Sequence, residues 1–187
     1  MVVIPLLWVL FLCGIHETLG TFGAATIAYG PIGLNRPTGV AVDTISDSLF
    51  IVDTNNSRVL RFSNRNSLTP LDTPISLFGQ SNWTQTSPNG GQGQASASVF
   101  AYPTSACVDE NGTLFVSDTG NNRIMVFPQA SIAVSGALAS QLLGQENFTV
   151  SYANQGLSVV NAEGVSNPSG LSCSSEDCWA VDPGNNR

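Results

Sequence analysis

The chain has 187 residues, with 13 acidic and 6 basic side chains and a formal net charge of −7 at pH 7. All the basic residues are arginines. A chain with this excess of acid lacks the positive field that attracts phosphate backbones, so its composition argues against a nucleic-acid-binding protein. Its length is sufficient for one hydrophobic core.

The first twenty residues differ in composition from the rest. Residues 2–15 are almost wholly apolar, and residues 18–20 (Thr-Leu-Gly) place small side chains at the two positions that a signal peptidase recognises. We therefore predict a signal peptide over residues 1–20, followed by a lead-in segment over 21–34, and a secreted or extracellular protein without a membrane span in its mature part. The alternative is a membrane anchor, although about fourteen apolar residues are fewer than the roughly twenty of a spanning helix.

Four sequons for N-linked glycans agree with secretion, and they begin at Asn55, Asn82, Asn111 and Asn147. Asn111 precedes a glycine, and the Asn-Gly pair is typical of an exposed hairpin turn. Asn55 lies inside a compact turn of the repeat described below. We therefore predict glycans at Asn82, Asn111 and Asn147.

A pattern of short apolar runs separated by turns repeats from residue 35 onward. First strands are expected at 37–43, 103–109 and 168–173, second strands at 49–52, 114–117 and 178–181, third strands at 59–62 and 124–127, and fourth strands at 75–78 and 140–143. Phe62 and Phe127, like Gly79 and Gly144, are 65 residues apart. Agreement in strands and connectors alike indicates a tandem repeat.

The repeat predicts an all-β fold, a β-propeller of four-stranded antiparallel blades. An isolated blade of this kind cannot bury both faces, and packing against neighbours around an axis solves the problem. We place the units at about 35–99, 100–164 and 165–187, of which the third holds only the first strands. The expectation is therefore a propeller fragment with about two and a half blades.

Each unit contains an aspartate, then turn-forming residues, then an arginine five positions later. The pairs are Asp53 and Arg58, Asp118 and Arg123, and Asp182 and Arg187. An aspartate that ends one strand can pair with an arginine that opens the next, so we predict three structural ion pairs. A ring of such carboxylates around Ca²⁺ is the alternative, but the one-to-one match with arginine favours pairing, and we assign no catalytic, metal or cofactor residues.

The turn between the paired residues contains Asn55, Gly120 or Gly184 at one shared position. These residue types tolerate a positive φ better than most, so the pattern predicts a positive φ there. Cys173 and Cys178 flank a four-residue turn, and we predict a disulfide between them. Cys107 is expected to be a buried thiol.

The segments Pro-Thr-Gly-Val-Ala-Val-Asp at 37–43 and Asp-Thr-Gly-Asn-Asn-Arg at 118–123 resemble the NHL repeat. The resemblance implies a propeller that serves as a protein-, RNA- or ligand-binding platform. With the acidic composition, it implies a secreted or cell-surface non-catalytic scaffold for a protein or glycan ligand, without a cofactor. The alternative is a metal-dependent propeller hydrolase or lyase whose catalytic residues lie outside this fragment.

Overall fold

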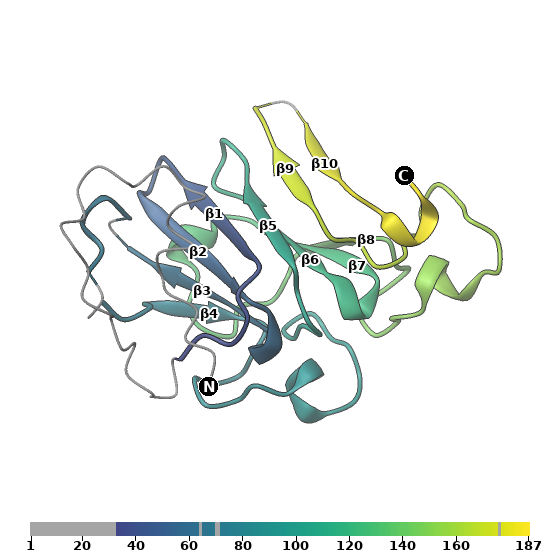
Figure 1. Ribbon diagram of the computed structural model, residues 1–187, viewed down its shortest axis with the longest axis horizontal. Coiled ribbons are helices and arrows are strands. Elements are labelled where there is room, and N and C mark those ends of the chain that lie inside the picture. The colour runs from purple at the N-terminus through teal and green to yellow at the C-terminus, as the bar shows by residue number, and fades with distance from the viewer. Residues whose placement is uncertain (1–32, 64, 70–71, 176) are drawn as a thin grey trace.

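The computed structural model describes residues 33–63, 65–69, 72–175 and 177–187 (Figure 1). The predicted signal peptide at 1–20 and most of the lead-in segment at 21–34 lie outside the described residues. Within the described part of the chain, no helix has both the length and the apolar character needed to cross a bilayer.

The described residues form two four-stranded antiparallel sheets and one two-stranded sheet, and the strands of each larger sheet follow chain order. The first blade contains β1 (Gly39–Asp43), β2 (Ser48–Asp53), β3 (Arg58–Phe62) and β4 (Ser76–Phe78). The second contains β5 (Ser105–Val108), β6 (Leu114–Asp118), β7 (Arg123–Phe127) and β8 (Gln141–Leu143). The third sheet is the hairpin of β9 (Leu171–Cys173) and β10 (Cys178–Ala180). The predicted all-β fold of four-stranded propeller blades is confirmed.

Short 3₁₀ helices occupy the turns and connectors. They are η1 (Thr54–Asn56), η2 (Arg65–Ser67), η3 (Pro88–Gly91), η4 (Thr119–Asn121), η5 (Ala130–Ile132), η6 (Ala153–Gly156) and η7 (Pro183–Asn185). Three of them, η1, η4 and η7, form the turns that join or follow the second strands, and each ends in a left-handed residue. The repeat is therefore regular in its turns as well as in its strands.

The core lies between the two complete blades because the middle strands are apolar on both faces. All six residues of β2 and all five of β7 are buried. Phenylalanines from both blades meet there, with ring centroids 5.2 Å apart for Phe78 and Phe127 and 5.9 Å apart for Phe100 and Phe127. Each blade therefore covers an apolar face of the neighbouring blade, which could not bury that face by itself.

The first strands β1, β5 and β9 lie next to one another in the structure (Figure 1). The hydroxyl of Thr38 donates to the carbonyl of Thr104 at 2.8 Å, and the hydroxyl of Thr104 donates to the carbonyl of Ser169 at 3.1 Å. One threonine contact is thus used at both junctions between successive sheets. It sets the stagger of neighbouring first strands.

Antiparallel order places the loops on two opposite rims. One rim adjoins the starts of the first and third strands, and we call it the connector rim. It consists of residues 79–91 and 144–156 together with the turns at 54–57, 119–122 and 183–186. We call the turns at 44–47 and 109–113, with the loop at 128–140, the loop rim, since they adjoin the opposite strand ends.

Candidate functional site

The aspartate and arginine of the second blade form a buried network in the turn between β6 and β7. Asp118 and Arg123 are directly opposite in the strand register, and Arg123 Nε donates to Asp118 Oδ2 at 2.7 Å. The same oxygen accepts Asn121 Nδ2 at 2.8 Å, while Oδ1 accepts the backbone N–H of Ala101 at 2.7 Å. Neither side chain of the ion pair is exposed.

The guanidinium of Arg123 also holds the connectors against this turn. One terminal nitrogen donates to the carbonyl of Phe148 at 2.6 Å, and the other donates to those of Ser96 and Val99 at 2.8 and 3.0 Å. Arginine suits this task because its planar fork presents several fixed donors. Arg123 thus joins the hairpin turn to two separate stretches of connector.

The other units repeat the arrangement. Arg58 Nε donates to Asp53 Oδ2 at 2.8 Å, with both side chains buried. Arg187 Nε donates to Asp182 Oδ2 at 2.9 Å, but the Arg187 side chain is 40% exposed. The structure therefore places all six of these residues in pairs, and the third pair is the most open to solvent.

Burial and hydrogen bonding act in opposite directions on these carboxylates. Burial raises the pKa of Asp118, while Arg123, the N–H of Ala101 and Asn121 oppose the rise. Burial likewise raises the pKa of Asp53 against the bonds from Asn35, Asn56 and Arg58. Hydrogen-bond donors occupy both oxygens of each carboxylate, as expected for structural groups rather than for a catalytic acid or base.

The sequence prediction missed two further members of the network. Asn121 and Asn89 exchange side-chain amide hydrogen bonds at 2.8 and 3.2 Å. Gln80 Nε2 donates to the carbonyls of Asn56, Ser57 and Ser87. The same contacts recur one unit later. Asn154 and Asn185 repeat the asparagine pair, and Gln145 repeats the bonds of Gln80. The recurrence of Asn89 and Gln80 at a spacing of 65 residues was the available signal.

The prediction about the turn glycines is wrong. The positive φ falls two residues later, at Ser57 (50°), Asn122 (52°) and Asn186 (57°). Gly120 has a different role, because a Cβ added there would lie 2.7 Å from the carbonyl oxygen of Ala101. The glycine provides room for the preceding connector rather than a left-handed backbone.

The three predicted glycosylation residues are exposed. Asn82 and Asn147 occupy equivalent corners of the connector rim, and each accepts a hydrogen bond from the threonine hydroxyl of its own sequon, at 2.9 and 2.7 Å. Asn111 lies on the opposite, loop rim, in the turn between β5 and β6. Asn55 is half-buried, and its amide nitrogen donates to the side chain of Asn35 at 3.3 Å.

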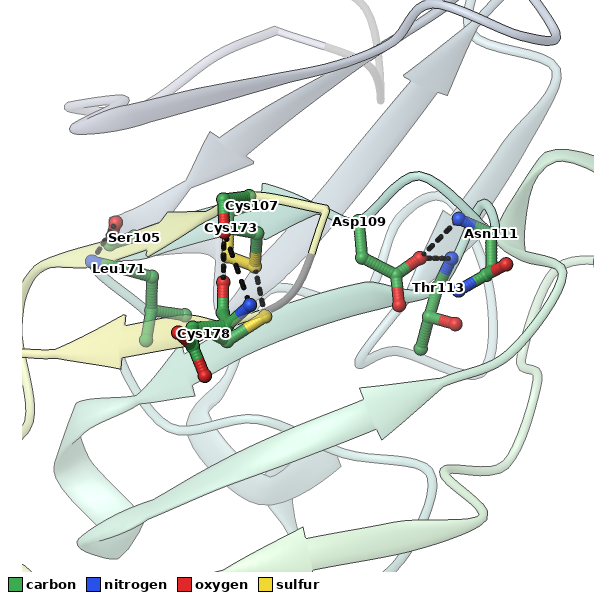
Figure 2. The surroundings of a disulfide bond; sticks show 10 residues. Ser105, Cys107, Asp109, Asn111, Thr113, Leu171, Cys173 and Cys178 are labelled. Atoms are coloured by element: carbon green, nitrogen blue, oxygen red, sulfur yellow. Dashed lines mark hydrogen bonds between the residues drawn. A yellow bond between two sulfur atoms is a disulfide. The ribbon is translucent and has the colours of Figure 1, made fainter.

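The disulfide prediction is wrong in its pairing. Cys173 and Cys178 do lie opposite each other in the β9–β10 register, but Cys173 is bonded to Cys107 on the neighbouring strand β5 (Figure 2). The Cα atoms of Cys107 and Cys173 are 5.7 Å apart, which is within the ordinary span of a disulfide. Cys107, expected as a buried thiol, is instead half of a covalent link between two sheets.

Cys178 is a free, exposed thiol beside this bond. Its sulfur lies 2.7 Å from Cys173 Sγ, and all three cysteine sulfurs lie within 4.8 Å of one another. Partial burial, Asp109 and Asp177 raise the pKa of the Cys178 thiol. Within the described residues, this cysteine cluster is the one group of three or more His, Cys, Asp or Glu side chains close enough to share an ion.

Successive four-stranded antiparallel blades, joined through their first strands and locked by a repeated Asp–Asn–Arg network, define a β-propeller-type repeat protein. The family model "NHL repeat" matches residues 34–62 and 100–127, which hold the first three strands of each complete blade. The chain therefore contains NHL repeats, and the resemblance noted in the sequence is confirmed.

Solved structures similar to this chain include three named enzymes. A gluconolactonase from Xanthomonas campestris is 16% identical, with a TM-score of 0.44, over 80% of this chain and 35% of that one. A streptogramin B lyase is 12% identical, with a TM-score of 0.34, over 78% and 48%. A virginiamycin B lyase from Staphylococcus aureus is 13% identical, with a TM-score of 0.30, over the same shares.

The chain spans less than half the length of each of these proteins, and at such similarity we infer nothing about its chemistry from them. The comparison with curated proteins gave no match.

Proposed function

We propose that this chain acts as a secreted or cell-surface scaffold, without catalysis, that binds a protein on its loop rim. The observation that carries the proposal is a set of aliphatic side chains exposed on that rim. They are Ile45 (72% exposed), Ile132 (74%), Val134 (76%) and Leu138 (68%). Exposed apolar side chains in surface loops are typical of protein contact sites.

The charged residues of the repeat support the same proposal. Asp53, Arg58, Asp118 and Arg123 are buried and engaged within the protein, so the signature residues serve the fold. The surface available to a partner is consequently made of loop side chains. Isoleucine, valine and leucine favour a protein over a glycan, since a sugar needs polar partners for its hydroxyl groups.

Secretion is proposed from the apolar N-terminal segment together with the exposed sequons. The test is expression of the full chain in a secretory eukaryotic cell line, with mass-spectrometric mapping of the protein recovered from the medium. We expect glycans at Asn82 and Asn147, because each presents an exposed amide in the same threonine-bonded turn. Retention inside the cell with unmodified asparagines would contradict this part of the proposal.

The binding test uses the secreted protein against a panel of extracellular protein domains and a glycan array. A double variant, Ile132→Asp with Val134→Asp, should weaken binding to a protein partner by about tenfold or more, as loss of an apolar anchor does. Val159→Asp is the matched control, because Val159 is 72% exposed but lies in the segment after η6, outside the loop rim. Equal loss in both variants, or binding to glycans alone, would contradict a protein site on the loop rim.

The metal-dependent hydrolase or lyase remains the alternative. Metal-stimulated turnover by a longer protein that contains this chain, unaffected by the Ile132 and Val134 substitutions, would support it instead.

A further inference from the structure

The cysteine cluster between the second blade and the terminal hairpin contains a disulfide and a free thiol in direct contact. Cys107 on β5 is bonded to Cys173 on β9, and Cys178 on β10 places its sulfur 2.7 Å from Cys173 Sγ (Figure 2). A thiolate attacks a disulfide through the sulfur that it can approach, and here the nearest disulfide sulfur is that of Cys173.

We propose that Cys107, Cys173 and Cys178 form an intramolecular thiol–disulfide exchange site. The Cys178 thiolate attacks Cys173 Sγ, a Cys173–Cys178 bond forms, and the Cys107–Cys173 bond breaks. The electron pair of the broken bond leaves on Cys107 Sγ, which takes up the proton that Cys178 released. One disulfide and one thiol exist before and after the step, so it needs no oxidant or reductant.

The strand geometry allows Cys173 to form a disulfide with either Cys178 or Cys107. Cys173 and Cys178 are directly opposite in the β9–β10 hairpin, where Cβ atoms of paired residues are about 4.5–5.5 Å apart and approach further on closure. Cys107 is reached across the junction of the first strands, with Cα atoms 5.7 Å apart. Cys173 can thus take part in either of two disulfides, one within the β9–β10 hairpin and one between two sheets.

The two forms differ in where the free thiol lies. When Cys107 and Cys173 are bonded, the free thiol is Cys178, which is exposed. After exchange the free thiol is Cys107, whose residue is only 8% exposed. The exchange therefore hides a surface thiol and removes the covalent tie of the terminal hairpin to the second blade.

Noncovalent contacts keep the hairpin near the blade in either form. The backbone N–H of Leu171 donates to Ser105 Oγ at 3.1 Å, and Thr104 donates to the carbonyl of Ser169. The exchange accordingly loosens the junction without separating the sheets. Partial burial and the charges of Asp109 and Asp177 disfavour the Cys178 thiolate, so the exchange should quicken as the pH rises.

The arrangement of arginines makes the two disulfides easy to distinguish. The chain has no lysine, so trypsin cleavage after Arg65 and Arg123 releases peptides 66–123 and 124–187. Cys107 lies in the first peptide, and Cys173 and Cys178 lie in the second. A Cys107–Cys173 bond joins the two peptides, whereas a Cys173–Cys178 bond is internal to one.

The experiment follows the full chain in oxygen-free buffer with a metal chelator, at pH 7 and pH 9. Excess iodoacetamide is added to the native protein, and samples are quenched in acid at successive times. Any N-glycans are then removed, and the masses of the tryptic peptides are measured by mass spectrometry. We expect both disulfide forms at the first time point. The internally bridged peptide should then convert to the cross-linked pair with alkylated Cys178, and should do so faster at pH 9.

Three variants assign the species. Cys178→Ser should give only the cross-linked pair, Cys107→Ser only the internal bridge, and Cys173→Ser shows whether Cys107 and Cys178 bond to each other. A single disulfide form in the unsubstituted protein at both pH values, or two forms whose ratio never changes, would overturn the proposal. This time course uses the unsubstituted chain, so it decides the question even if a variant fails to fold.

Discussion

Asp118 and Arg123 face each other across the turn between β6 and β7, with 2.7 Å between Oδ2 and Nε and neither side chain exposed to solvent. The pair is part of a larger network, because the same arginine donates to three connector carbonyls. Loss of either partner leaves a buried charge or several buried carbonyls without their donors. Substitution of either residue is therefore expected to destabilise the second blade.

Arg123→Ala should lower the free energy of unfolding by about 3–5 kcal/mol, the usual result of breaking a buried ion pair from one side. Asp118→Ala should cost a similar amount. The double variant should cost clearly less than the sum, because the two side chains interact directly. Denaturant unfolding of all three proteins measures these differences.

The matched control is the surface ion pair of Arg65 and Asp47, in which Nε and Oδ1 are 2.8 Å apart and the side chains are 28% and 36% exposed. Arg65→Ala should cost only about 0–1 kcal/mol, since exposed pairs are screened by solvent. Equal costs for Arg65→Ala and Arg123→Ala would refute the conclusion that the buried contacts of Arg123 stabilise the second blade.

Gly120→Ala tests the role that the structure gives to this glycine. The new methyl group would lie 2.7 Å from the backbone oxygen of Ala101, so the connector has to move, and we expect a loss of about 1–3 kcal/mol. The equivalent residue of the first blade, Asn55, already carries a Cβ. Asn55→Ala should therefore be much milder, and thermal unfolding of the two variants gives the comparison.

Asp43 predicts a specific dependence of stability on pH. Burial alone would raise its pKa, but hydrogen bonds from Ser46 and Ile45 and the charge of Arg61 together lower it. A lowered pKa in the folded state means that the contribution is present above the ordinary aspartate pKa of about 3.9 and is lost as the pH falls through the folded-state pKa. The stability difference between the unsubstituted protein and Asp43→Asn should thus be largest near neutral pH and shrink in acid.

Ser46→Ala is the control for this effect. The Ser46 hydroxyl donates to Asp43 Oδ2 at 2.5 Å, so its removal should reduce the pH dependence while Asp43 remains. Urea unfolding between pH 2 and pH 7 measures both variants. A stability difference for Asp43→Asn that does not vary with pH would show that the carboxylate is not stabilised in the fold.

The cysteine variants should differ in stability because their disulfides close loops of very different length. Cys107 and Cys173 are 66 residues apart, whereas Cys173 and Cys178 are five apart. On the loop-entropy scale the longer closure is worth about 2 kcal/mol more than the shorter. Cys178→Ser should consequently unfold at a higher denaturant concentration than Cys107→Ser, and the reverse order would contradict the inter-sheet bond.

Much of each blade could be predicted from local pattern. The strands lie where alternating apolar runs predicted them, and Asp118 is opposite Arg123 because a five-residue separation across one turn leaves the backbone little choice. The register of Cys173 with Cys178 follows from the same geometry. These features depend on residues close together in the chain, whose distances the backbone itself limits.

The partner of Cys173, the reason for Gly120 and the contacts of Gln80 depend on how separate segments pack. Cys107 reaches Cys173, 66 positions further along the chain, only because β5 and β9 lie side by side in the folded protein. Gly120 is needed because a connector passes within 2.7 Å of where its Cβ would be. The sequence by itself determined the repeat, its hairpins and its ion pairs, since local backbone geometry limits the alternatives. The tertiary structure alone decided the disulfide and the close approaches, because the distance between blades is set by the packing of side chains from both.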